Sequence, residues 1–114
     1  MGAHAAAGAE PEIEIGAEAI VVRPSGELDV DQAPALRTAL LSALAHAGGP
    51  TEVVVDLSGV EFCDSSGLNV LIRARLVAEE SGRGIRLAAP NAQMARLLDV
   101  TGVGTTFVVD PDAP

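Results

Sequence analysis

The chain has 114 residues and a formal net charge of −9, because 16 acidic residues outnumber 7 basic ones. This length fits one domain with a modest core, and a hydrophobic content of 48% excludes wholesale disorder. The acidic balance and the lack of tryptophan and tyrosine argue against a nucleic-acid or anionic-membrane surface. The single cysteine, Cys63, rules out an internal disulfide and fits a reducing cytosol.

The first residues do not look like a structural element. Residues 1–11 are rich in alanine and glycine and are predicted to form a flexible tail. They lack the basic and long apolar regions of a signal peptide, and no later apolar run reaches the length of a membrane span. We therefore expect a soluble cytoplasmic domain over residues 12–110, followed by a short tail at 111–114.

Two short strands and a helix are predicted next. Residues 13–15 alternate in polarity and residues 19–23 are mostly apolar and β-branched, so their tight connection predicts an antiparallel hairpin. Asp29 and Asp31 are candidate caps of a following helix, and Pro34 suits its first turn.

The rest of the chain alternates between strands and helices. The apolar run at 53–57 predicts a strand covered on both faces, as in a parallel sheet under helices. Further helices are expected from residues 65 and 90, and further strands at 85–87 and 106–109. This order predicts an α/β fold: a mostly parallel four- to five-stranded sheet with helices packed on it and an antiparallel N-terminal edge hairpin.

The residues that catalysis needs are absent or badly placed. His4 lies in the predicted tail and His46 at the end of a helix, so neither is placed to activate a serine. The nucleophile elbow and the glycine-rich phosphate loops are also absent, and one cysteine with two distant histidines cannot build a zinc site. We expect a protein that is not an enzyme and that uses no metal or cofactor.

The segment Asp64-Ser65-Ser66-Gly67-Leu68 is the strongest candidate for a functional site. A purely structural interpretation is that Asp64 or Ser65 caps a helix and Gly67 lets the backbone turn. A functional interpretation is that the segment presents a modifiable hydroxyl at a helix N-terminus. The two are compatible, because a cap lies at the surface, where a partner can reach it.

Three stretches resemble the STAS domain family, and within it the bacterial anti-sigma factor antagonists. Residues 54–60 followed by 64–68 resemble the family's phosphorylation segment. Residues 26–29 resemble the loop before its first helix, and residues 94–102 resemble its late helix. The likeness extends over about residues 12 to 110 and implies a STAS-like single domain.

The resemblance also implies a function. Ser66 would accept a phosphate from an anti-sigma factor that is a serine kinase and also holds a sigma factor, with Ser65 as the fallback acceptor. The unphosphorylated chain would bind this kinase and release the sigma factor, and phosphorylation would end the binding. A metal-dependent serine phosphatase would restore the cycle.

Helical spacing predicts the face that the partner binds. Ser66, Asn69, Val70 and Arg73 fall on one side of the helix, and Leu68, Leu71, Ile72 and Leu76 lie largely on the other, toward the sheet. An ordinary solvated face is the competing explanation for Val70 and Arg73. The predicted partner-binding residues, together with the segment 26–30, are Glu27, Asp29, Asp64, Ser65, Ser66, Gly67, Asn69, Val70 and Arg73.

Other functions fit the sequence less well. The chain could be a STAS scaffold or adaptor subunit, in a signalling assembly or a transporter complex, that phosphorylation does not regulate. An acyl carrier protein also has an Asp-Ser helix start, but its all-helical fold conflicts with the predicted strands. A hydrolase acting through Ser66 would lack a base.

Overall fold

The computed structural model describes residues 10–114, so most of the predicted N-terminal tail lies outside the described residues. The strands are β1 (Glu12–Ile15), β2 (Ile20–Arg23), β3 (Gly26–Leu28), β4 (Glu52–Asp56), β5 (Val60–Cys63), β6 (Gly84–Ala88) and β7 (Val108–Asp110). The helices are α2 (Ala33–Leu44), α3 (Ser65–Glu80) and α4 (Ala92–Thr101), followed by the short 3-10 helix η1 (Val103–Thr105).

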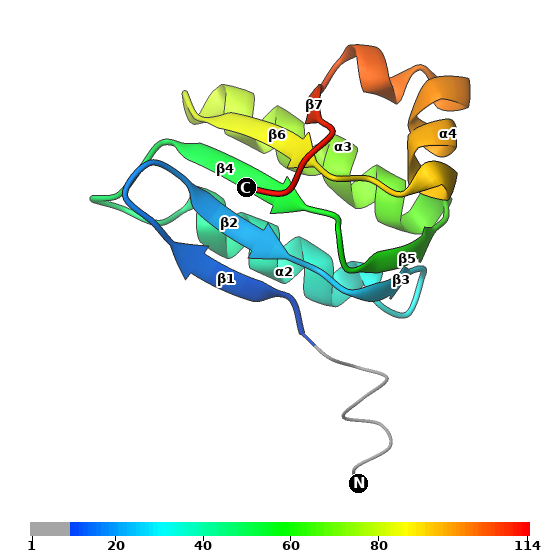
Figure 1. The fold of residues 1–114 in the computed structure, drawn as a ribbon. Coiled ribbons are helices and arrows are strands. Elements are labelled where there is room, and N and C mark those ends of the chain that lie inside the picture. The colour runs from blue at the N-terminus through cyan, green and yellow to red at the C-terminus, as the bar shows by residue number, and fades with distance from the viewer. Residues whose placement is uncertain (1–9) are drawn as a thin grey trace, which may run out of the picture.

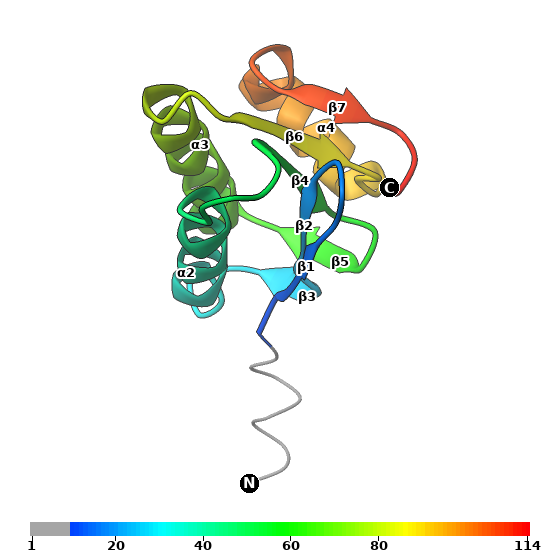
Figure 2. The ribbon, with the colours of Figure 1, turned by 90° about the vertical axis from the view of Figure 1, so that its left-hand side faces the viewer.

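Five strands form the main sheet, in the order β1-β2-β4-β6-β7. The pair β1 and β2 is antiparallel, and the other pairs are parallel. Helices α2 and α3 lie side by side over one face of this sheet, and α4 lies at its end beside β5 (Figures 1 and 2). The predicted α/β fold with an antiparallel edge hairpin is confirmed.

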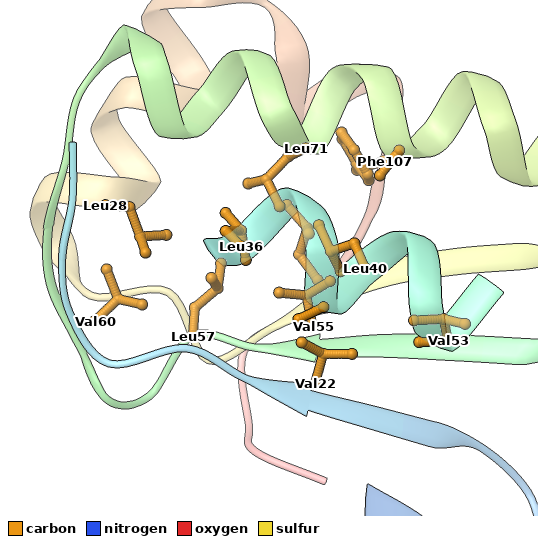
Figure 3. Close-up of a cluster of buried hydrophobic side chains, with 14 of the residues drawn as sticks. Val22, Leu28, Leu36, Leu40, Val53, Val55, Leu57, Val60, Leu71 and Phe107 are labelled. Atoms are coloured by element: carbon orange, nitrogen blue, oxygen red, sulfur yellow. The ribbon is translucent and has the colours of Figure 1, made fainter. Parts of the chain in front are cut away.

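The core fills the space between the sheet and the helices (Figure 3). Val22 and Val55 point from the strands toward Leu40 and Leu71 on the helices, and all four side chains are fully buried. Alternate residues of each strand face this layer, because successive side chains of a strand point to opposite faces. The sheet and both long helices therefore share one hydrophobic cluster.

The opposite face of the sheet differs from the prediction. The apolar run in β4 predicted helices on both faces. Val54 is indeed buried on the second face, with Val21 and Ala88, but among residues 10–114 only the segment after β7 crosses that face in Figures 1 and 2. Several charged side chains on this face form ion pairs: Arg23 with Glu14 and Asp56, and Arg86 with Glu52 and Asp110. Long arginine stems can shield apolar neighbours, so a buried valine does not require a helix above it.

Two strands escaped the sequence analysis. β3 and β5 pair in parallel as a separate two-stranded sheet, whereas the sequence pattern predicts a loop at 26–29 and no element at 60–63. β3 has three residues and β5 has four, and the burial of β5 does not alternate. So short a pair leaves no local periodicity to detect, because its strands are fixed by pairing across more than thirty positions of sequence.

The predicted core-facing side of α3 is partly wrong. Leu68 and Leu71 are buried as expected, but Ile72 is half-buried and Leu76 is 52% exposed. The cause is the helical twist, the angle by which each residue advances around the helix axis. Each residue advances about 100°, so a four-residue spacing drifts about 40° per step and carries Leu76 to the solvent side.

These positions predict unequal effects of the same substitution. Leu71→Ala should lower the free energy of unfolding by about 2–5 kcal/mol, because it leaves a cavity in the core. Leu76→Ala, in the same helix, should change it by about 0.5 kcal/mol or less. Urea denaturation of both variants measures the difference, and equal losses would contradict the assigned burial.

Candidate functional site

The small sheet brings two acidic segments to one edge. Leu28 pairs with Cys63 in parallel register, so Asp29 and Asp64 follow at the carboxyl ends of neighbouring strands. The backbone N–H of Asp64 donates a 3.2 Å hydrogen bond to the carbonyl oxygen of Leu28, which ties the two ends together. The residues 26–29 that resemble a family loop therefore lie directly beside the serine segment.

Asp64 caps α3. Its Oδ1 accepts hydrogen bonds from the backbone N–H groups of Ser66, at 2.8 Å, and Gly67, at 3.5 Å. This satisfies amide donors that the first turn of a helix leaves free. Of the two predicted caps, Asp64 is the one that the structure uses.

Asp29 plays a similar part before α2, but it is not the cap of that helix. Its Oδ1 accepts from the backbone N–H groups of Asp31, at 3.1 Å, and Gln32, at 3.2 Å, which holds the turn after β3. The residue at the cap position of α2 is Gln32, and Pro34 stands in the first turn. The prediction that Asp29 or Asp31 caps α2 is therefore wrong, although the region of the helix start is right.

Gly67 is needed for a reason other than the predicted turn. It lies inside α3 and is buried. A Cβ atom there would meet the carbonyl oxygen of Leu28 at 2.6 Å and the Cβ of Leu28 at 2.7 Å. Glycine therefore lets the first turn of α3 pack directly on β3.

Side chains from the start of α4 brace the other edge of β5. Gln93 accepts a hydrogen bond from the Cys63 N–H at 3.0 Å and donates one to the Cys63 carbonyl at 2.9 Å. Asn91 donates to the carbonyls of Val60 and Glu61 and accepts from the N–H of Met94, so it also caps α4. Backbone groups that would otherwise be unpaired at this edge are thus satisfied.

Cys63 is a core residue. Its side chain is fully buried. Burial, together with the nearby Asp64 carboxylate, raises the pKa of the thiol to about 11. The thiolate is the reactive form of cysteine, so this buried and protonated thiol fits a packing role.

Both candidate acceptor hydroxyls are accessible. Ser65 is exposed and Ser66 is half-buried, and neither side chain makes a hydrogen bond within residues 10–114. Beside them the surface forms a hollow, which Asn69 and Ile72 also line. A partner can therefore reach either hydroxyl without disturbing the bonds that cap the helix.

The predicted binding face divides into two parts. Asn69 lies at the hollow beside the serines, whereas Val70 and Arg73 line a groove between α3 and α2. Arg37, on α2, lines the same groove and was not predicted. No pattern local to α3 could have indicated it, because the packing of the two helices brings it there.

Exposed apolar side chains flank the acidic edge. Phe62 is 43% exposed and pairs in register with Glu27, which is also exposed. Val30, within the predicted segment 26–30, is 68% exposed. Phe62 was missed because β5 was not recognised as a strand with an outward face.

No group of three histidine, cysteine or acidic side chains among residues 10–114 could hold a metal ion. No helix in the same range has the length and apolar character needed to cross a membrane.

Gly67→Ala should destabilise the protein by about 1–3 kcal/mol, because the added methyl group overlaps the Leu28 backbone. An unconstrained glycine in a helix would show the opposite sign, since alanine is favoured there by about 0.5–1 kcal/mol. Ser65→Ala is the control in the same turn and should be nearly neutral. Denaturant unfolding measures all three proteins, and a Gly67→Ala variant as stable as the wild type would refute the close packing.

The buried thiol of Cys63 should lower the free energy of unfolding at alkaline pH. The chain has no lysine or tyrosine, so Cys63 is the one side chain that titrates between about pH 9 and 11. In this interval the unfolded thiol loses its proton while the native thiol, with its pKa raised from 9.0 to about 11, keeps it.

The free energy of unfolding should therefore fall by about 1–3 kcal/mol as the pH rises from about 9 to 11. Cys63→Ala should lack this fall. Urea titrations at each pH compare the two proteins, and parallel pH profiles would show that the native thiol is not shielded.

Comparisons with known proteins agree with this geometry. Residues 12–110 match a family model described as "Mlab, STAS domain". The anti-sigma-B factor antagonist of Bacillus subtilis (strain 168) is 33% identical over 84 residues, 74% of each chain. The anti-sigma F factor antagonist of Lysinibacillus sphaericus is 34% identical over 88 residues, 76% of this chain and 74% of the relative.

A solved structure supports the same relationship. The crystal structure of an anti-sigma factor antagonist from Mycobacterium paratuberculosis matches with a TM-score of 0.79 and 33% sequence identity, over 89% of this chain and 84% of that one. The family model spans both sheets and all the described helices. This chain belongs to the STAS domain family.

Proposed function

We propose that this protein is an anti-sigma factor antagonist that works by partner switching in the cytoplasm. The unphosphorylated chain binds an anti-sigma factor that is a serine kinase, and the kinase releases its sigma factor. Phosphorylation of Ser66 ends this binding, and a serine phosphatase restores it. The observation that carries the proposal is a serine hydroxyl at the capped, accessible N-terminus of α3 that makes no hydrogen bond within the described residues. The relatives of this chain bear the name of antagonist.

The choice of Ser66 over Ser65 rests on two arguments. Ser66 is the position that resembles the acceptor of the family's segment, and it lies on the side of α3 that leads to Val70 and Arg73. Ser65 is the more exposed of the two serines and remains the fallback acceptor. Mapping the phosphate by mass spectrometry after incubation with the kinase and ATP distinguishes them.

A phosphate on Ser66 would change the surface more than the fold. It adds about −1.5 to −2 charges, which a helix N-terminus stabilises by roughly 0.3–1 kcal/mol. Here the Ser66 and Gly67 amides already bind Asp64, and the Asp29 carboxylate lies on the neighbouring strand end. The stabilisation by the helix N-terminus and the repulsion by the Asp64 and Asp29 carboxylates oppose each other. The main effect of the phosphate therefore falls on the binding of a partner.

The arrangement also indicates what the partner surface offers. Glu27, Asp29 and Asp64 give the site a negative rim, with Phe62 and Val30 exposed nearby. Basic and apolar groups on the kinase would complement these residues. Gly67, predicted to touch the partner, is buried against Leu28, so its contribution is to position the neighbouring serines.

Ser66→Asp should weaken binding to the kinase by about 30-fold or more, because an unpaired charge in an interface costs about 2–5 kcal/mol. Ser66→Ala should keep the binding and abolish phosphorylation. Isothermal titration calorimetry with the purified kinase measures both affinities, and Ser65→Asp is the neighbouring control. Full binding by Ser66→Asp, with no phosphate on Ser66, would instead favour a scaffold that phosphorylation does not regulate.

A further inference from the structure

A groove between α2 and α3 is a second feature of the surface that partner switching can use. Its walls are Arg37, Leu40 and Leu41 on α2, and Val70, Arg73 and Val77 on α3. Its volume is about 180 Å³, below the 300–1,000 Å³ or so of typical small-molecule sites. The groove is therefore better suited to side chains of another protein than to a metabolite.

Two arginine side chains at the groove have no partner among residues 10–114. Within residues 10–114, four of the arginines bind carboxylates or backbone carbonyls: Arg23, Arg75, Arg83 and Arg86. Arg37 and Arg73 make no hydrogen bond or ion pair with the described chain, and both are exposed. In a protein of net charge −9, two guanidinium groups that are unpaired within the described part of the chain thus flank one apolar groove.

We propose that this groove binds an acidic amphipathic helix of the kinase that the proposed function requires. The apolar side of that helix packs on Leu41, Val70 and Val77, and its carboxylates pair with Arg37 and Arg73. Helix-in-groove docking uses apolar anchors of this kind. Arginine suits the role because its planar fork binds a carboxylate through two hydrogen bonds.

The position of Ser66 connects the groove to phosphorylation. Ser66 precedes Arg73 by seven residues on the same side of α3, which is about 10 Å along the helix axis. This is comparable to the Debye length of about 8–10 Å at physiological ionic strength. A phosphate on Ser66 therefore repels an acidic helix in the groove as well as disturbing the contact at the serine itself.

The groove also gives the partner one orientation. The Ser66 end of the surface is acidic, with Asp29 and Asp64, whereas the groove carries Arg37 and Arg73. A partner with basic groups at one end and acidic groups at the other fits in one direction only. Charge patterns of this kind increase the specificity and the rate of association more than they increase the affinity.

The test reverses the charge of the groove. The double variant Arg37→Glu/Arg73→Glu should bind the kinase at least about tenfold more weakly than the wild type and with a smaller salt dependence. Arg96→Glu is the matched control, because Arg96 lies on α4 outside the groove, is exposed and forms no ion pair with the described residues. Calorimetry at low and high salt compares the proteins, after thermal unfolding confirms that each is folded.

The outcomes separate the groove from the phosphorylation switch. If the double variant binds as well as Arg96→Glu does, the groove proposal is overturned, whatever Ser66→Asp does. If the double variant binds the kinase weakly but Ser66→Asp binds it fully, the groove proposal is supported and the phosphorylation switch is contradicted. If the wild type does not bind the kinase, the proposed function fails. A synthetic peptide then tests whether the groove binds an acidic amphipathic helix.

That peptide is a synthetic amphipathic helix with leucines on one side and glutamates along both flanks. In ¹H–¹⁵N NMR spectra it should shift the amide signals of Leu41, Val70 and Val77, and the same peptide with lysines in place of the glutamates should not. No shift in the groove with the glutamate peptide, or equal shifts with both, would overturn the proposal.

Discussion

The contact between Gly67 and the backbone of Leu28 is the constraint on which the rest of the site depends. A side chain as small as alanine would overlap Leu28 there, so the first turn of α3 can approach β3 because residue 67 is glycine. The Asp64 N–H binds the Leu28 carbonyl beside the same contact, and the Asp64 carboxylate caps the helix. One close approach therefore fixes the strand register, the helix start and the position of the serines.

The sequence predicted what local patterns encode. The order of the main elements, the edge hairpin and the Asp64 cap follow from periodicity and residue type over a few positions. The pairing of β3 with β5 and the presence of Arg37 opposite Arg73 arise from tertiary packing, which leaves no periodic signal. The burial predicted for Leu76 is wrong, because its apolar character and regular spacing are typical of a core residue whereas the helix turns it to solvent.

Rigidity and accessibility are combined at this site. The Asp64 cap and the Gln93 amide hold the backbone around the serines, while the serine hydroxyls make no hydrogen bond with any of residues 10–114. A modification of Ser66 then need not break a structural bond. On this account the phosphate acts as a change of charge on a fixed surface, between an acidic edge and a groove lined by Arg37 and Arg73.

The most direct test of this account compares ¹H–¹⁵N NMR spectra of the protein before and after phosphorylation of Ser66. The account predicts that shifted amide signals are confined to the first turn of α3 and the adjoining ends of β3 and β5. Signals from the core, such as those of Val55 and Leu71, should stay in place. Widespread shifts across the core would show instead that the phosphate rearranges the fold.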